Sequence, residues 1–312
     1  MLLLVQYTLI FSSVLILVAL GGCISEHSGV INLGLEGIMV MGALGGALAM
    51  RFLPEMGAFA TVVLVILIAV LFGMLYSCML GVACINFKAD QTLVGTAMNL
   101  LGTAAATVLV KAINTAANPD NHSSEIEYIA ARKKFIANIG SFEFNWFMLI
   151  AVVAVIVVFL LLYKTRFGLR LMACGEHPQA ADSVGINVYK MRWSGVLISG
   201  FLGGLGGICY ILAGVSIWKF ENGVAGFGFL ALAVMIFGQW KPTRIALAAL
   251  LFGFFRALSN VYNGFDFLVA LNLPSNVYNM LPYIISLVVL ALTSGKSRAP
   301  KAEGIPYDKG QR

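Results

Sequence analysis

Apolar stretches long enough to cross a lipid bilayer recur from one end of this chain to the other. A helix needs about 20 residues to span the hydrocarbon core. The alternation of polar and apolar residues that is typical of outer-membrane strands does not occur in these stretches. The sequence therefore predicts an all-α integral membrane protein with about nine transmembrane helices. The nine spans lie near residues 2–22, 31–53, 58–84, 92–111, 145–163, 194–217, 225–240, 244–262 and 276–293.

The composition excludes a soluble globular protein. Of the 312 residues, 60% are hydrophobic and only 11% are charged, whereas a soluble domain carries about 25% charged residues. The net charge of +6 does not indicate nucleic-acid binding, because Lys and Arg are spread along the connections between spans. We therefore expect membrane lipid, and no nucleic acid, as a partner.

The positions of Lys and Arg predict the orientation of the spans. With residues 296–312 inside the cell, the inner connections hold more than twice as many Lys and Arg as the outer ones, in accord with the positive-inside rule. The N-terminus is then outside and the C-terminus inside. Residues 1–295 form one permease-like membrane domain, and 296–312 form a polar cytoplasmic tail. Segment 112–144 is an extracytoplasmic loop with a short surface helix near 125–137, and segment 164–193 is a cytoplasmic loop.

Polar residues inside the predicted spans require an explanation. An ionisable residue at this depth costs about 2.5–3.5 kcal/mol on insertion scales and usually faces a bundle interior or a pathway. These residues either line a water-filled substrate pathway or satisfy one another and free carbonyls within the bundle, and Arg256 has the further option of reaching outward to the interface. Two aromatic residues at a presumed helix break either stack on a planar ligand or anchor the interface. The pathway candidates are Asn32, Glu36, Asn99, Phe227, Phe229 and Arg256.

Glycine patterns mark two further features. Gly29-Val30 with Gly34 resembles Gly223-Val224 with Gly228, and on the predicted topology the two segments enter the membrane from opposite sides. Such a pair is typical of an inverted-topology repeat, and chance similarity is the alternative.

The sixth span carries overlapping small-residue motifs that predict close helix packing. A cofactor-binding loop is excluded because no strand precedes these glycines. They are Gly200, Gly203, Gly204 and Gly207.

The sequence contains no recognisable catalytic, metal or cofactor site, so we do not expect an enzyme. The histidines His27, His122 and His177 lie on separate connections, and no HExxH motif occurs. The five cysteines form no CxxC pair. No nucleotide-binding loop is present either, since Gly295-Lys296-Ser297 lacks the first glycine of that motif and a leading strand.

The cytoplasmic loop contains Gln179-Ala180-Ala181-Asp182-Ser183-Val184-Gly185. A short helix ended by Gly185 is able to dock into a groove of a partner and transmit its motion, and an ordinary solvated loop is the alternative. This segment resembles the E-A-A-x-x-x-G pattern of ABC importer permeases, with Gln in place of the first Glu. The resemblance extends to four blocks, in the same order as in the permeases of branched-chain amino acid, simple-sugar and nucleoside ABC importers. The blocks are GVINLGLEGIMVMGA (29–43), YKTRFGLRLMACGEHPQAADSVGINVYKMR (163–192), SGFLGGLGG (199–207) and GVAGFGFLALAVMIFGQWKP (223–242).

The nucleoside-type subgroup, which also contains riboflavin and some sugar permeases, fits best. The resemblance implies a subunit that moves a small polar solute by alternating access, most simply a nucleoside, then riboflavin or a simple sugar. It implies cytoplasmic ATPase subunits, an extracytoplasmic substrate-binding protein, a second permease chain, and a place in the bacterial cytoplasmic (inner) membrane. A related but different second chain is expected, and pairing with itself stays open. The residues implied to couple to the ATPase are Glu176, Gln179, Ala180, Ala181, Asp182 and Gly185.

A stand-alone, ion-driven secondary transporter is the alternative. Such a carrier is expected to hold several acidic residues at mid-membrane, whereas the predicted spans contain only Glu36. A membrane enzyme is less well supported, because no paired acid and base groups converge.

Overall fold

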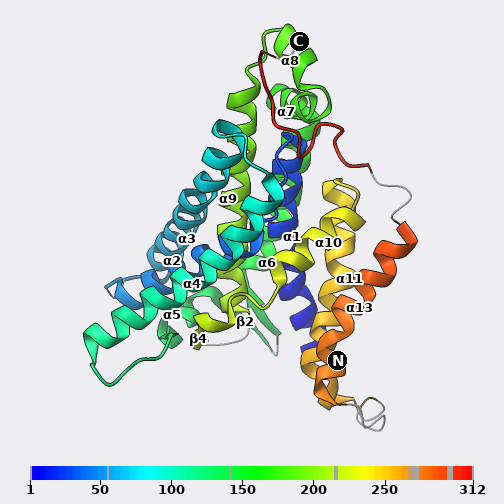
Figure 1. The fold of residues 1–312 in the computed structure, drawn as a ribbon. Coiled ribbons are helices and arrows are strands. Elements are labelled where there is room, and N and C mark those ends of the chain that lie inside the picture. The colour runs from blue at the N-terminus through cyan, green and yellow to red at the C-terminus, as the bar shows by residue number, and fades with distance from the viewer. Residues whose placement is uncertain are drawn as a thin grey trace.

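The computed structural model describes residues 2–54, 56–140, 142–213, 217–265, 268, 274–293 and 298–310. The chain forms a helical bundle with two small two-stranded sheets at one end (Figure 1). The prediction of an all-α membrane protein is confirmed. Within the described residues, eight helical segments are long and apolar enough to cross a membrane. Their main helices are α1 (Leu2–His27), α2 (Leu35–Phe52), α3 (Ala58–Gly81), α4 (Gln91–Ala117), α6 (Trp146–Lys164), α9 (Val188–Leu212), α10 (Phe227–Phe237) and α11 (Pro242–Val261).

Three short helical turns extend these spans, namely η1 (Val82–Asn86) after α3, η3 (Phe220–Asn222) before α10 and η4 (Tyr262–Gly264) after α11. A further helix, α13 (Ser275–Thr293), coincides with the ninth predicted span and packs against α10 and α11. The count of nine crossings stays a prediction.

Helices α1, α2 and α9 form the centre of the bundle. α1 packs against α9, α10 and α11, and α9 also packs against α2 and α3. The outer helices α3, α4 and α6 instead expose Leu, Val and Ile side chains along their length. Exposed apolar faces around a buried core are the arrangement that a lipid environment requires.

Glycines allow the central helices to approach one another closely. A Cβ atom on Gly42 of α2 would lie 2.5 Å from the Cα atom of Gly204 on α9. Gly200 of α9 faces Gly73 of α3, Gly203 faces Ile38 of α2, and a Cβ atom on Gly207 would clash with the backbone of α2. The small-residue motifs of the sixth span thus lie at the contacts of α9 with α2 and α3.

Two predicted segments differ from the structure. α9 ends at Leu212, not at residue 217, and Ile217–Lys219 form strand β4, which pairs antiparallel with β1 (Glu125–Glu127). The short surface helix predicted near 125–137 is present only over α5 (Ile129–Arg132) and the 3₁₀ turn that follows it, and strands flank it on both sides. In β1, Ile126 is buried between two exposed glutamates, and this two-residue period favours a strand over a helix.

The rest of segment 112–144 is also irregular. α4 continues to Ala117, and a 3₁₀ turn η2 (Lys133–Phe135) leads into a hairpin of β2 (Ile136–Ile139) and β3 (Phe142–Asn145). The buried ring of Phe135 stacks on Phe147, with centroids 5.9 Å apart. This contact secures the turn and the hairpin against the start of α6.

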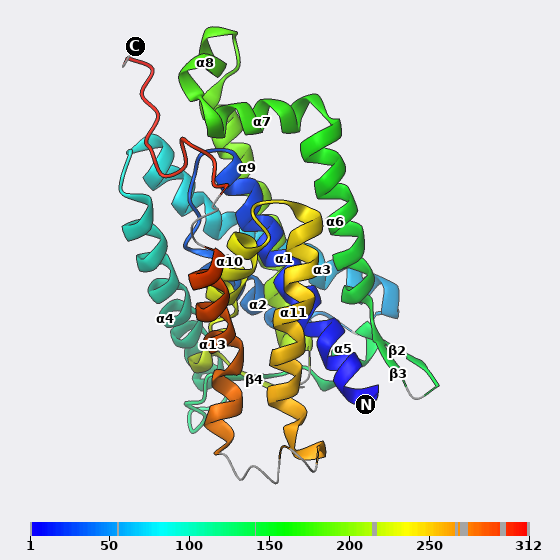
Figure 2. The ribbon, with the colours of Figure 1, turned by 90° about the vertical axis from the view of Figure 1, so that its right-hand side faces the viewer.

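The two termini lie at opposite ends of the bundle (Figures 1 and 2). We call the end that holds α7 (Arg166–Glu176) and α8 (Pro178–Ser183) the upper end, as drawn, and the end that holds the strands the lower end. The upper end is the predicted cytoplasmic side, and this assignment remains a prediction.

The predicted polar tail folds back onto the upper end as a segment of turns and irregular chain, residues 298–310, which we call the C-terminal strap (Figure 2). The Ala302 N–H donates to the Gly175 carbonyl of α7 at 2.8 Å, and Arg192 of α9 donates to the Ile305 carbonyl at 2.9 Å. The buried Tyr307 ring lies 5.3 Å from the ring of Tyr189. The strap is therefore part of the packed structure, held by backbone hydrogen bonds that composition does not reveal.

We expect the docking of the strap to depend on pH through the carboxyl group of Glu303. It is packed beside Glu26, which accepts a hydrogen bond from the Trp240 indole, and burial raises the pKa of Glu303 to about 7. Because the docked strap binds this proton more tightly than the free strap, docking strengthens as pH falls from about 7 towards 4.5 and weakens as pH rises.

We expect the strap to open about 10-fold more often at pH 8 than at pH 6. Hydrogen exchange of the strap amides, corrected for the intrinsic rate at each pH, measures this opening. In the variant Glu303→Gln, strap opening should lose most of its dependence on pH. Equal opening at both pH values in the wild type would contradict a proton held at this carboxyl.

Candidate functional site

The chain leaves helical geometry at two points inside the bundle, before α2 and before α10. Gly29 ahead of α2 has φ of +91°, and Gly223 ahead of α10 has φ of +55°. The valines that follow these glycines, Val30 and Val224, are both fully buried. The two glycines matched in sequence thus share a positive φ, which favours glycine. That the two segments form an inverted repeat stays a prediction.

Glu36 of α2 joins the two breaks. Its Oε1 atom accepts a hydrogen bond from the Gly226 N–H at 2.8 Å, and its Oε2 atom accepts one from the Gly228 N–H at 2.6 Å. A carboxylate at a helix N-terminus satisfies amides that have no partner within the helix and interacts favourably with the helix dipole. A Cβ atom on Gly228 would clash with the backbone of Glu36, so this contact also requires glycine.

Asparagines hold α2 in the same way. Asn99 of α4 accepts a hydrogen bond from the Gly37 N–H at 2.9 Å and donates one to the Leu33 carbonyl at 2.8 Å. Asn32 accepts from the Gly34 N–H at 3.1 Å and donates to Ser199 of α9 at 2.8 Å. These polar side chains therefore satisfy the backbone at the break, as one of the two interpretations of the sequence expects.

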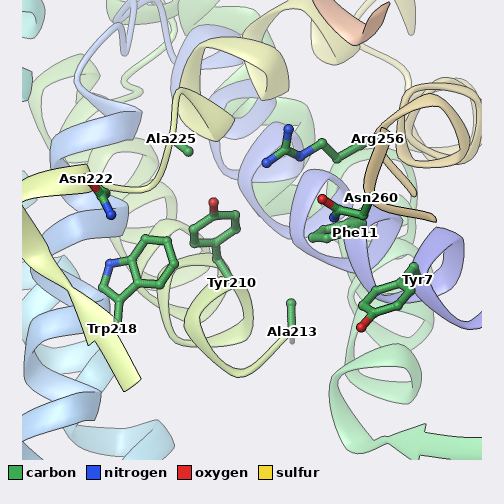
Figure 3. A pocket seen from close by; sticks show the side chains of 9 residues that line it. All are labelled: Tyr7, Phe11, Tyr210, Ala213, Trp218, Asn222, Ala225, Arg256 and Asn260. Atoms are coloured by element: carbon green, nitrogen blue, oxygen red, sulfur yellow. The ribbon is translucent and has the colours of Figure 1, made fainter. Parts of the chain in front are cut away.

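A cavity of about 650 Å³, which we call the aromatic cavity, lies between α1, α9, α11 and the segment that leads into α10 (Figure 3). Figure 3 shows the Arg256 side chain extending from α11 over this space, with the Tyr210 hydroxyl pointing towards it. Asn260 lies one helical turn beyond Arg256. The lining residues are Tyr7, Phe11, Tyr210, Ala213, Trp218, Asn222, Ala225, Arg256 and Asn260.

A second cavity of about 390 Å³, which we call the polar cavity, lies on the other side of the same segment and faces α4. Asn222 lines both cavities, so the chain from Asn222 to Gly226 separates them. Polar groups deep in a membrane bundle that border open space are typical of a solute pathway. The lining residues are Glu36, Thr96, Asn99, Leu100, Thr103, Glu221, Asn222, Gly223 and Phe229.

The six pathway candidates from the sequence therefore fall into three groups. Glu36, Asn99 and Phe229 border the polar cavity, and Arg256 borders the aromatic cavity. Asn32 is fully buried and lines neither of these cavities.

Phe227, the last of the six, lies behind the wall of the aromatic cavity. Its ring packs on Tyr210, with centroids 4.5 Å apart. The ring thereby supports Tyr210 from behind.

The sequence analysis did not identify the aromatic residues and the asparagines that line the aromatic cavity. Tyr7, Tyr210 and Trp218 are ordinary residues of apolar stretches, and they meet only because α1, α9 and β4 converge. One local signal existed, since Asn260 follows Arg256 at a spacing of four residues and thus shares its helix face.

The short helix expected before Gly185 is confirmed as α8. It begins at Pro178, and Gly185 follows with φ of +84° and open space around its Cβ position. Gln179 and Ala180 are exposed, while Ala181 is buried against α7, the start of α9 and the strap. One face of α8 is therefore available to a partner.

The remaining predicted coupling residues differ in their surroundings. Glu176 is exposed at the end of α7. Asp182 lies 4.0 Å from Lys309 of the strap, which gives α8 a second link to the C-terminus. The buried face of α8 sets the orientation of its exposed face.

Comparison with known proteins identifies a family with this sequence. The family model described as branched-chain amino acid transport system / permease component matches residues 4–290. The guanosine ABC transporter permease protein NupQ of Bacillus subtilis is 40% identical, with 99% of this chain and 97% of NupQ covered. The nucleoside ABC transporter permease protein NupC of Lactococcus lactis is also 40% identical, with 97% and 96% covered. NupB of the same organism, likewise a nucleoside ABC transporter permease protein, is 23% identical, with 76% and 67% covered.

The match covers the helices, both breaks and the segments that line the two cavities. The chain therefore belongs to the family of branched-chain amino acid transport system permease components.

Proposed function

We propose that the chain is one membrane-spanning permease subunit of an ABC importer that takes up nucleosides. The observation that carries this proposal is 40% identity, over nearly the full length, to two permeases of nucleoside transporters. The two cavities on either side of a broken segment support it, because a solute pathway needs polar surface within the bundle.

The packing provides a route by which movement at α8 reaches the cavities. Ala181 of α8 packs against Val188 at the start of α9. α9 contacts α2 through the close approach of Gly204 to Gly42, and Glu36 of α2 holds the N-terminus of α10. Tilting α8 therefore displaces α9 and α2 and shifts the segment between the cavities, as alternating access requires.

The partners follow from what this chain lacks. ATPase subunits dock on the exposed face of α8 and hydrolyse ATP, since the sequence has no nucleotide-binding loop of its own. A different permease chain supplies the other half of the pathway, in keeping with the two nucleoside permeases from Lactococcus lactis. A substrate-binding protein delivers nucleoside at the lower end, on the outer face of the bacterial cytoplasmic membrane.

Glu36, the only acidic residue within the predicted spans, binds the backbone at the start of α10. Each oxygen of Glu36 accepts a hydrogen bond from a backbone N–H of the α10 segment. A group bound in this way stabilises a helix terminus. We therefore assign Glu36 a positioning role at the border of the polar cavity.

The substitution Glu36→Gln tests this role. The Gln side chain places an NH₂ group, which is a donor, opposite one of the two backbone N–H groups. That buried N–H of α10 then has no acceptor, at a cost of about 1–3 kcal/mol. We expect nucleoside uptake by the assembled transporter to fall about 10-fold or more, and the melting temperature of the subunit to fall as well. Glu143→Gln, at an exposed position on β3, is the matched control. Unchanged uptake kinetics in Glu36→Gln would remove this residue from the machinery.

Adjacent alanines test the docking of α8. Ala180→Trp places a large ring on the exposed face, so it should leave the thermal stability of the subunit unchanged and reduce both ATPase binding and uptake. Ala181→Trp overpacks a buried site and should cost about 1–3 kcal/mol of stability. Pull-down of the ATPase, uptake and melting curves distinguish the two effects. Full uptake by the Ala180→Trp transporter would contradict docking at this face.

A further inference from the structure

Arg256 brings a positive charge to the aromatic cavity. The structure shows no salt bridge to Arg256 among the residues that it describes. Its Nε atom is buried without a hydrogen-bond partner. An ionised group within a membrane bundle is costly unless other groups compensate its charge and donors. The guanidinium group lies beside Tyr210 and lines the cavity, so its terminal N–H groups are within reach of a ligand that enters.

Aromatic rings surround this guanidinium. Its central carbon lies 5.4 Å from the ring centroid of Phe227 and 5.9 Å from that of Phe11. The rings of Tyr210 and Trp218 meet edge to face, with centroids 5.3 Å apart, and both line the cavity. Flat aromatic surfaces bind planar rings by stacking. The cavity thus combines surfaces that suit a nucleobase with a fork of hydrogen-bond donors.

The guanidinium discriminates among nucleobases by their edges. Its planar fork makes two parallel hydrogen bonds to neighbouring acceptors. Guanine presents such a pair in O6 and N7, and hypoxanthine presents the same two atoms. Adenine presents N7 beside an amino donor, which opposes the guanidinium N–H groups. A phosphate group also binds guanidinium, but Arg256 is the only cationic residue that lines this cavity in the described part of the chain.

We propose that Arg256 selects purine nucleosides that carry an oxygen at C6, by donating two hydrogen bonds to O6 and N7. The base lies against the rings of Tyr210 and Trp218, in a cavity whose volume of about 650 Å³ is within the usual range for small-ligand sites. This inference rests on the proposed function and specifies the substrate of the same pathway. It makes the permease itself, in addition to the binding protein, a determinant of specificity.

The test compares uptake of inosine and adenosine, two nucleosides with the same sugar and different atoms at C6. Vesicles contain the complete transporter with its ATPase and second permease. Each uptake rate is divided by the fraction of the binding protein that is loaded with the same nucleoside. The wild type should favour inosine about 10-fold. In Arg256→Gln the preference should reverse, because a Gln amide pairs with N6 and N7 of adenine. In Arg256→Lys, which keeps the charge and loses the fork, the preference should fall without reversing.

Arg244→Gln, on the same helix at the upper end, is the matched control and should retain the wild-type ratio. Copurification of the ATPase shows whether each variant assembles. An unchanged ratio in assembled Arg256→Gln, or in assembled Arg256→Lys, would overturn the proposal. Equal uptake of the two nucleosides by the wild type, or stronger inhibition by inosine 5′-phosphate than by inosine, would also overturn it. A wild-type transporter that takes up no nucleoside would instead refute the proposed function.

Discussion

The contact between the Glu36 carboxylate and two backbone amides of the α10 segment is the constraint on which the centre of this protein depends. A broken helix within a membrane leaves N–H groups that lipid cannot satisfy, and each costs several kcal/mol if it stays unpaired. Glu36 supplies an acceptor to Gly226 and to Gly228. The break before α10 is therefore stable only while α2 stays in place, and this requirement ties the position of one break to the position of the other.

The remaining packing serves to hold α2. Asn99 binds the Leu33 carbonyl just before α2 and the Gly37 N–H in its first turn. Glycines on α9 bring that helix into backbone contact with α2 and α3. At the upper end, the C-terminal strap links α7, α8 and α9 through Gly175, Asp182 and Arg192. These contacts form one continuous path from the exposed face of α8 to the segment that separates the two cavities, so a displacement at one end has a mechanical route to the other.

Particular residues show how far prediction from sequence reached. The third predicted span, 58–84, coincides with α3 and η1, because a long apolar run in this protein has no stable state other than a helix. The predicted sixth span ran past the end of α9 at Leu212 as far as Ile217, which lies in a strand, and the helix predicted near 125–137 is flanked by strands. Apolar and polar residues are mixed in both places. In those places the pairing of Ile217–Lys219 with Glu125–Glu127 decides the structure, and no local signal marks a strand partner about ninety residues away.

The site was predictable only in part, for the same reason. Glu36 and Arg256 are conspicuous in sequence because a charge in a membrane span is costly, and the structure places each of them at the border of a cavity. The partners of these residues were not predictable. The amides that bind Glu36 lie about 190 positions further along the chain, and the rings around Arg256 come from α1, α9, β4 and α10.

The sequence by itself determined the membrane class, the approximate helices, the small-residue contacts and the helix α8, since each of these depends on hydrophobicity and short-range spacing. Only the tertiary structure decided which polar residues cap helices and which border open space. It also decided that the polar C-terminus packs as a strap and that α8 exposes one face. These features depend on contacts between distant segments, and the geometry of such contacts exists only after the bundle has formed.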